Sequence, residues 1–219
     1  SQHENCERLH WCLLVACRAA ASASRARVFV GVSDIFLIDR STVDCRLMRA
    51  DLGLVGFGHV GRRFARPLDE RRDFLEREFD LTCRITGIAT RRHGSVYDQA
   101  GLDAPAAALV VEAGGTLFDG GRSAQEARVS NSRDLITRLA QSAAPLRVLI
   151  ETTTLDIAAA QPALDHVRLG LEAGCHVVTA NKGPVAFAYR ELSLLAAQRD
   201  RLFLFEGAVM DGVPVFNLV

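Results

Sequence analysis

The stretch Leu52-Gly53-Leu54-Val55-Gly56-Phe57-Gly58-His59-Val60-Gly61 places three glycines in the spacing G-x-G-x-x-G directly after an apolar run. In a loop that joins a strand to a helix, Gly56 permits a tight turn, Gly58 lets the backbone approach a pyrophosphate, and Gly61 allows close packing of the helix on the strand. The N–H groups at the start of the helix favour phosphate as well. The stretch predicts a dinucleotide-binding loop made of Gly56, Phe57, Gly58, His59, Val60 and Gly61. The alternative is a glycine-rich turn that binds nothing.

Downstream of this loop, short β-rich runs alternate with helical stretches, which is typical of a parallel sheet covered by helices. The predicted strands are Leu52–Val55, Ile85–Ala89, Arg147–Ile150, His176–Thr179 and Leu202–Phe205. The predicted helices are Val60–Glu78 with a kink or break at Pro67, Ala104–Glu112, Leu135–Gln141, Pro162–Ala173 and Val185–Arg199, and Gly114–Ser132 is a predicted loop. The expected fold class is α/β: a Rossmann-like doubly wound, mostly parallel sheet with helices on both faces.

The composition bounds the class of protein. With 219 residues, 49% of them hydrophobic, the chain is long enough to bury a full core without disulfides or metals. A formal net charge of zero gives no general attraction to nucleic acid, and no apolar run reaches the roughly 18 residues of a membrane span. The six cysteines are scattered without a C-x-x-C pair, which favours reduced thiols and a cytoplasmic location.

The basic residues comprise 25 arginines and one lysine, Lys182. A sequence that drifts toward arginine and spares one ammonium indicates a site that needs a compact, titratable charge. Lys182 lies in Thr179–Pro184, at the carboxyl end of a predicted strand, where ligands of open α/β sheets bind. We therefore predict that Lys182 is catalytic and contacts the cofactor, stabilising the alkoxide that develops during hydride transfer. The alternative is that this lysine survived by chance.

Two further polar runs follow predicted strands. Thr90-Arg91-Arg92-His93 stands where an NAD-specific site carries an acidic residue, and the guanidiniums of Arg91 and Arg92 suit a 2′-phosphate. This predicts NADP(H) in preference to NAD(H), unless both arginines are merely solvated. In Glu151-Thr152-Thr153-Thr154, we predict that Thr152 and Thr153 hydrogen-bond a ribose or the nicotinamide amide, with ordinary turn chemistry as the alternative.

Four segments, GFGHVG at Gly56, ETT at Glu151, HVVTANKGP at His176 and EGAVMDGVP at Glu206, resemble homoserine dehydrogenase over about Ala50 to Val219. The resemblance implies NAD(P)H-dependent interconversion of L-aspartate 4-semialdehyde and L-homoserine, on the route to threonine and methionine. It implies that Lys182 sits between nicotinamide and substrate and that Thr153 lines the cofactor site. It also implies a homodimer in the complete enzyme. A monovalent cation, Na⁺ or K⁺, is implied at Glu206, Val209, Asp211 and Val213.

The chain divides into three predicted parts: residues 1–47 as an atypical extension, 48–205 as the NAD(P)-binding domain, and 206–219 as the start of a truncated substrate and dimerisation domain. The resemblance places a second, proton-shuttling lysine in that later domain, and this chain has only Lys182. The expectation is a cofactor-binding fragment with little homoserine oxidation of its own. The alternatives are a related amino-acid dehydrogenase, such as an aspartate dehydrogenase, and a non-catalytic dinucleotide-binding module.

Overall fold

The computed structural model describes residues 48–119 and 127–208. Their strands form one sheet in the order β3-β2-β1-β4-β5-β6. The strands are β1 (Met48–Val55), β2 (Leu81–Ala89), β3 (Ser95–Tyr97), β4 (Leu146–Glu151), β5 (His176–Thr179) and β6 (Phe203–Leu204). Only the pairing of β3 with β2 is antiparallel within this sheet. The predicted α/β class with a mostly parallel sheet is confirmed.

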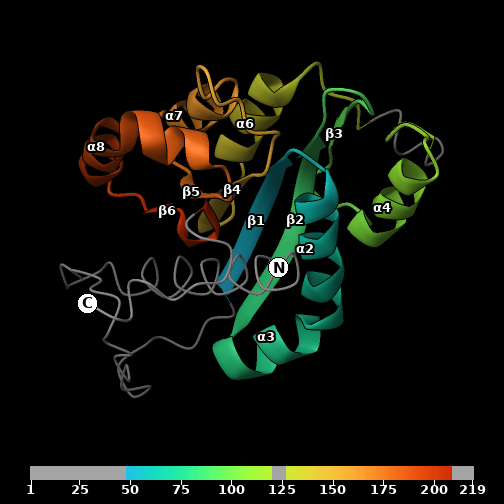
Figure 1. The fold of residues 1–219 in the computed structure, drawn as a ribbon. Helices are drawn as coiled ribbons and strands as arrows, with labels where there is room; N and C mark the ends of the chain where they lie inside the picture. The colour runs from blue at the N-terminus through green and yellow to red at the C-terminus, as the bar shows by residue number, and fades with distance from the viewer. Residues whose placement is uncertain (1–47, 120–126, 209–219) are drawn as a thin grey trace, which may run out of the picture.

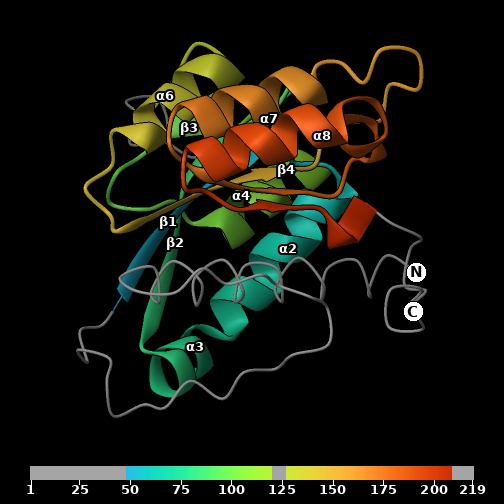
Figure 2. The same cartoon turned by 90° about the vertical axis from the view of Figure 1, so that its left-hand side faces the viewer.

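Helices cover both faces of the sheet (Figures 1 and 2). One face carries α2 (His59–Glu70), α3 (Arg72–Phe79) and α4 (Ala104–Glu112), and the other carries α6 (Ser132–Ala140), α7 (Ala163–Glu172) and α8 (Lys182–Gln198). A separate apolar core lies between each face of the sheet and the helices that cover it. The doubly wound arrangement predicted from the alternation of strands and helices is therefore also confirmed.

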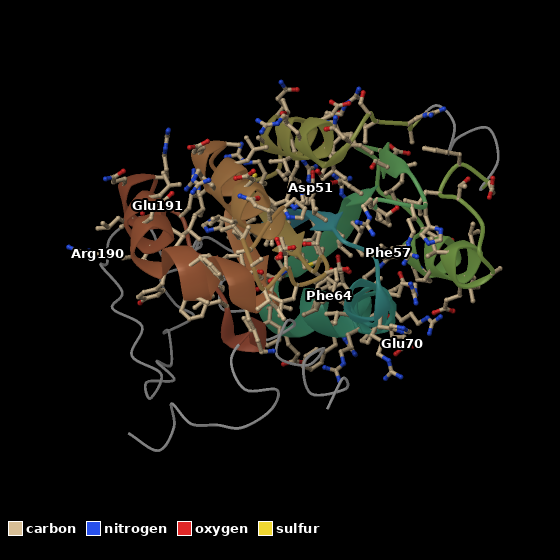
Figure 3. All side chains as sticks on the ribbon, turned by 45° about the horizontal axis from the view of Figure 1, so that its top comes forward. Asp51, Phe57, Phe64, Glu70, Arg190 and Glu191 are labelled. Carbon is tan, nitrogen blue, oxygen red and sulfur yellow. The ribbon has the colours of Figure 1, made fainter. Side chains whose placement is uncertain are left out.

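Strand β1 shows how the sequence pattern builds these two cores. Its residues Leu52 and Leu54 are fully buried against the core under α2, while Val55 packs into the core under α6 and α7. This alternation follows from the two-residue repeat of a strand. Asp51 (labelled in Figure 3) is also buried. Its carboxylate accepts hydrogen bonds from Arg84 at 2.9 Å and from Ser142 at 2.5 Å. The buried carboxylate is thus paired with a guanidinium and a hydroxyl of the same domain.

The helix predicted over Val60–Glu78 is two helices, and the break lies at Arg71 rather than at Pro67. Pro67 is inside α2, because the loss of one N–H is offset there by the buried stripe that includes Phe64 and Leu68. The Arg71 N–H bonds to the Pro67 carbonyl at 2.9 Å, and Arg71 has φ −97° and ψ 10°, which ends α2 and begins α3.

Other boundaries differ where long-range pairing decides them. The short strand β3 was missed, and it forms because Val96 pairs with Ile88 of β2. Helix α8 begins at Lys182, three residues before the predicted Val185, because the Asn181 side chain accepts a hydrogen bond from the Gly183 N–H at 3.0 Å and caps the helix. Ala104–Glu112 and His176–Thr179 have the predicted bounds.

The predicted segment 1–47 and most of 206–219 lie outside the described residues; within the latter, the short 3-10 helix η2 (Glu206–Ala208) is described. The free cysteines of the described part, Cys83 and Cys175, are both buried. In this same part of the chain, no helix combines the length and apolar character needed to span a membrane.

Candidate cofactor and active site

The glycine loop between β1 and α2 is fitted closely against the loop that follows β4. Gly56 has φ +93°, and a Cβ on it would lie 2.5 Å from the backbone carbon of Thr152. A Cβ on Gly61 would lie 2.7 Å from the Gly56 carbonyl oxygen. The chain therefore requires glycine at both positions for its own turn and packing.

Gly58 differs from the other two glycines. A Cβ built on it meets no atom within 4 Å, and its φ of −76° suits any residue. It is the exposed N-cap of α2, where no side chain caps the helix and where the first helical bond runs from the Arg62 N–H to its carbonyl at 3.1 Å. The N–H groups of the first turn precede that bond. The open space over Gly58 thus fits a phosphate group that approaches the helix end.

The remaining residues of the loop have distinct surroundings. Phe57 is buried in the same core as Phe64 of α2 (Figure 3), and its carbonyl accepts a bond from the Arg62 guanidinium at 2.9 Å. Val60 packs half-buried on this core, and His59 is exposed. Phe57 and Val60 therefore anchor the loop, whereas Gly58 and His59 face solvent.

The loop lies where the strand order reverses. β1 is flanked by β2 and β4, and the chain runs from β1 to β2 on one side and from β4 to β5 on the other. Ligands of doubly wound sheets bind in the crevice at this point, beyond the carboxyl ends of the strands. The Thr152 hydroxyl donates a 2.8 Å bond to the Gly56 carbonyl, so the predicted cofactor residue Thr152 adjoins the glycine loop.

A buried carboxylate connects the ends of β4 and β5. Glu151 is fully buried, and its Oε1 accepts hydrogen bonds from both the N–H and the hydroxyl of Thr153. Its Oε2 accepts a 2.7 Å bond from the Thr179 hydroxyl. Burial raises the pKa of Glu151, and the bonds from Thr153 and Thr179 oppose that rise. The carboxylate is held by donors alone.

The same network reaches the only lysine. The Thr179 oxygen accepts the Asn181 N–H at 3.0 Å, and the Asn181 amide donates to the Thr153 carbonyl at 3.2 Å. Asn181 in turn caps α8, whose first residue is the exposed Lys182. Since β4 and β5 are neighbouring parallel strands, Thr153 and Lys182 come to one edge of the sheet, together with the glycine loop.

Arg91 and Arg92 occupy the tip of the turn between β2 and β3. The Thr90 N–H and hydroxyl both bond to the Gly94 carbonyl, at 3.0 and 2.9 Å, which closes the turn. Both arginines are exposed, and neither has a hydrogen-bond or ion-pair partner within the described residues. This turn extends from β2, the strand beside β1, as the prediction of a 2′-phosphate contact requires.

The predicted cation residues are described only in part. Glu206 begins η2, whereas Val209, Asp211 and Val213 lie outside the described residues. No cluster of three or more His, Cys, Asp or Glu side chains suited to a metal ion occurs in 48–119 or 127–208.

Sequence reasoning did not assign roles to Glu151, Thr179 and Asn181, which form the centre of the network. A polar residue at the end of each of two strands was visible, but their contact depends on β4 lying beside β5. Glu151 and Thr179 are 28 positions apart, and no pattern of neighbouring residues indicates that their strands lie side by side.

The arrangement described above agrees with a family match. The model described as "Homoserine dehydrogenase, NAD binding domain" matches residues 56–206, from the glycine loop past Lys182. The chain belongs to this family. The resemblance inferred from the four motifs is confirmed, and residues 56–206 are a homoserine dehydrogenase NAD-binding domain.

Three relatives support the assignment. The NAD(+)-dependent homoserine dehydrogenase of Pseudomonas canavaninivorans is 34% identical over 76% of this chain and 45% of its own length. The homoserine dehydrogenase of Methanocaldococcus jannaschii is 30% identical over 77% of this chain and 47% of its own length. A hyperthermophilic archaeal homoserine dehydrogenase in complex with NADPH shares the fold at a TM-score of 0.59, with 27% identity over 78% of this chain and 48% of that one. The chain thus spans about half the length of these relatives.

Proposed function

We propose that this chain is the NADP(H)-binding part of an enzyme that interconverts L-homoserine and L-aspartate 4-semialdehyde. The observation that carries the proposal is Gly58: this glycine is not required by the packing of the chain, and it leaves open space at the N-terminus of α2, at the reversal of strand order. Dinucleotide pyrophosphates bind at this place in doubly wound folds. The NADPH complex of the archaeal relative supports the same assignment.

In this proposal Lys182 stabilises charge on the substrate oxygen. When bound, the nicotinamide supplies or accepts the hydride. As a hydride adds to the aldehyde carbon, the carbonyl oxygen becomes an alkoxide, and the ammonium of Lys182 stabilises that negative charge before the oxygen is protonated. The exposed position of Lys182 at the edge that holds the glycine loop suits this role.

We also propose a preference for NADP(H) over NAD(H). Arg91 and Arg92 extend from the end of β2 without a partner among residues 48–119 and 127–208, and a 2′-phosphate would give them a charge-assisted partner. The Pseudomonas relative is named as NAD(+)-dependent and the archaeal relative is in complex with NADPH, so the preference has to be measured on this chain.

The monovalent cation at Glu206, Val209, Asp211 and Val213, the homodimer and the cytoplasmic location stay predictions. The cation prediction is tested by comparing thermal unfolding in NaCl, KCl and choline chloride at equal ionic strength. Stabilisation by Na⁺ or K⁺ alone supports a cation site, and three equal melting curves contradict it.

The function is tested in two steps. First, NADPH and NADH are titrated into the purified chain, and binding is followed by cofactor fluorescence. We expect saturable binding with tighter affinity for NADPH, and the lack of any binding would overturn the proposal. Second, homoserine and NADP⁺ are added and NADPH absorbance is followed. As the NADP(H)-binding part of an enzyme, the chain should bind NADPH with little turnover. Turnover at an enzyme-like rate would contradict the expectation that this chain alone oxidises little homoserine.

A further inference from the structure

The hydroxyl protons of Thr152 and Thr153 are both used inside the protein. Thr152 donates to the Gly56 carbonyl and Thr153 donates to Oε1 of Glu151. A hydroxyl has one proton and two lone pairs, so each oxygen can act toward a ligand only as an acceptor. Both side chains are half-buried, at the edge of the sheet that carries the glycine loop.

The direction of the Thr153 bond is determined by its neighbours. Oε1 of Glu151 already accepts the Thr153 N–H at 2.8 Å, so this oxygen acts as an acceptor. The Thr179 oxygen accepts the Asn181 N–H at 3.0 Å, so its own proton is directed to Oε2 of Glu151. Every donor around the carboxylate is satisfied when Glu151 accepts all three bonds. If the Thr153 hydroxyl turned its proton outward, Oε1 of Glu151 would lose one of the two hydrogen bonds that it accepts.

We propose that Glu151 is a positioning residue that holds the Thr153 hydroxyl as a hydrogen-bond acceptor for the carboxamide N–H of the nicotinamide. This inference rests on the proposed function, since it concerns the same cofactor. Glu151 acts through Thr153 and does not touch the ligand. The site therefore recognises a donor on the nicotinamide ring and disfavours a ring substituent that lacks one.

The test compares NADP⁺ with its 3-acetylpyridine analogue, in which a methyl ketone replaces the carboxamide and removes the N–H donor. Affinities are measured by calorimetry at about pH 8, because burial raises the pKa of Glu151 and the proposal concerns its ionised form. We expect the unmodified chain to bind NADP⁺ about tenfold more tightly than the analogue, the size of effect expected for one hydrogen bond.

Four variants assign this discrimination to the proposed groups. Thr153→Val removes the acceptor while keeping the shape, and should bring the two affinities to within about twofold. Thr153→Ser restores the hydroxyl and should restore the discrimination. Glu151→Ala frees the Thr153 proton to bond the ketone oxygen of the analogue. This variant should therefore also lose the difference in affinity between NADP⁺ and the analogue. Thr137→Val, an exposed α6 position whose hydroxyl bonds only the Arg133 carbonyl among described residues, is the matched control.

The outcomes separate the two proposals. A chain that binds neither cofactor contradicts the proposed function. A chain that binds both cofactors equally, or a Thr153→Val variant that still discriminates tenfold, overturns the role of Glu151 and Thr153 while the proposed function stands. If Glu151→Ala does not fold, the comparison of valine with serine at position 153 decides the question, because in both variants Glu151 keeps the bonds from the Thr153 N–H and the Thr179 hydroxyl.

Discussion

The hydroxyl of Thr152 donates a 2.8 Å hydrogen bond to the carbonyl oxygen of Gly56. This bond joins the loops that follow β1 and β4, the two strands at which the order of the sheet reverses. The same carbonyl lies where a Cβ on Gly61 would approach to 2.7 Å, so it is packed from both sides. The glycine loop is therefore held against the loop that follows β4.

Thr152→Val should loosen this connection. It leaves the half-buried Gly56 carbonyl without the Thr152 donor, and we expect the free energy of unfolding to fall by about 1 kcal/mol, with weaker NADPH binding. Urea unfolding and cofactor titration measure the two effects. Thr152→Ser keeps the donor and should behave like the unmodified chain; equal losses in both variants would contradict the role of the hydroxyl.

Substitutions of Gly58 and Gly61 should separate cofactor binding from stability. Gly58→Ala adds a methyl group that touches no protein atom, so the free energy of unfolding should change by less than about 1 kcal/mol. NADPH affinity should fall at least about tenfold, because the methyl group occupies the space above the helix end. Gly61→Ala should instead lower stability by about 1 to 3 kcal/mol. A Gly58→Ala variant with unchanged affinity would show that no phosphate approaches this position.

Replacement of both arginines at the β2 end should change cofactor choice. In Arg91→Ala/Arg92→Ala, we expect NADPH affinity to fall about tenfold or more and NADH affinity to stay within about twofold, because only NADPH carries the 2′-phosphate. Fluorescence titration with both cofactors measures the ratio. The double variant Arg190→Ala/Arg199→Ala, at exposed positions on α8 and at its C-cap, removes the same number of charges and is the matched control. A parallel loss for NADH would point to a structural effect instead.

Lys182→Arg should preserve charge but not function. The side chain is exposed, so stability should change little. Because arginine keeps the positive charge beside the cofactor, NADPH affinity should also change little. In the form of the protein that oxidises homoserine, we expect turnover to fall by about 100-fold or more, because a delocalised guanidinium cannot place a compact charge at the developing alkoxide. Steady-state kinetics give the answer, and turnover close to that of the lysine enzyme would remove Lys182 from the mechanism.

His176 should make the protein less stable in acid. Burial, with Arg201 and Arg147 in the same direction, lowers the pKa of His176 from 6.5 to about 4. Between these values the unfolded chain binds a proton that the folded chain does not, so stability falls as the pH falls through this window, by about 2 kcal/mol between pH 7.5 and 5.

The variant His176→Asn isolates this contribution. Its amide oxygen can accept the Leu202 N–H, which now bonds Nδ1 of His176 at 3.1 Å, and asparagine does not titrate. His166, whose pKa burial also lowers, and Glu151, whose pKa burial raises, remain in both proteins and cancel in the comparison. Urea unfolding at the two pH values should show a loss about 2 kcal/mol smaller in the variant. Equal losses would contradict the assignment to His176.

Much of the fold could be predicted from local patterns. The apolar run before Gly56, the alternation of strands and helices, and glycines suited to a strand-helix turn are properties of neighbouring residues, and they led to the correct class. Even the bounds of α4 and β5 agree with the structure. The break at Arg71 was misplaced to Pro67, since the buried face of α2 outweighs the missing N–H of a single proline.

The residue types of the site are legible in the primary structure: a glycine loop, two arginines after a strand, a threonine run and a single lysine. Their assembly is not, because it depends on which strands are neighbours. Glu151 and Thr179 meet only because β4 lies beside β5, and Gly56 meets Thr152 only because β4 lies beside β1. Hydrogen bonds act over about 3 Å, whereas these partners are 28 and 96 positions apart, so only the packing of the strands brings them into contact.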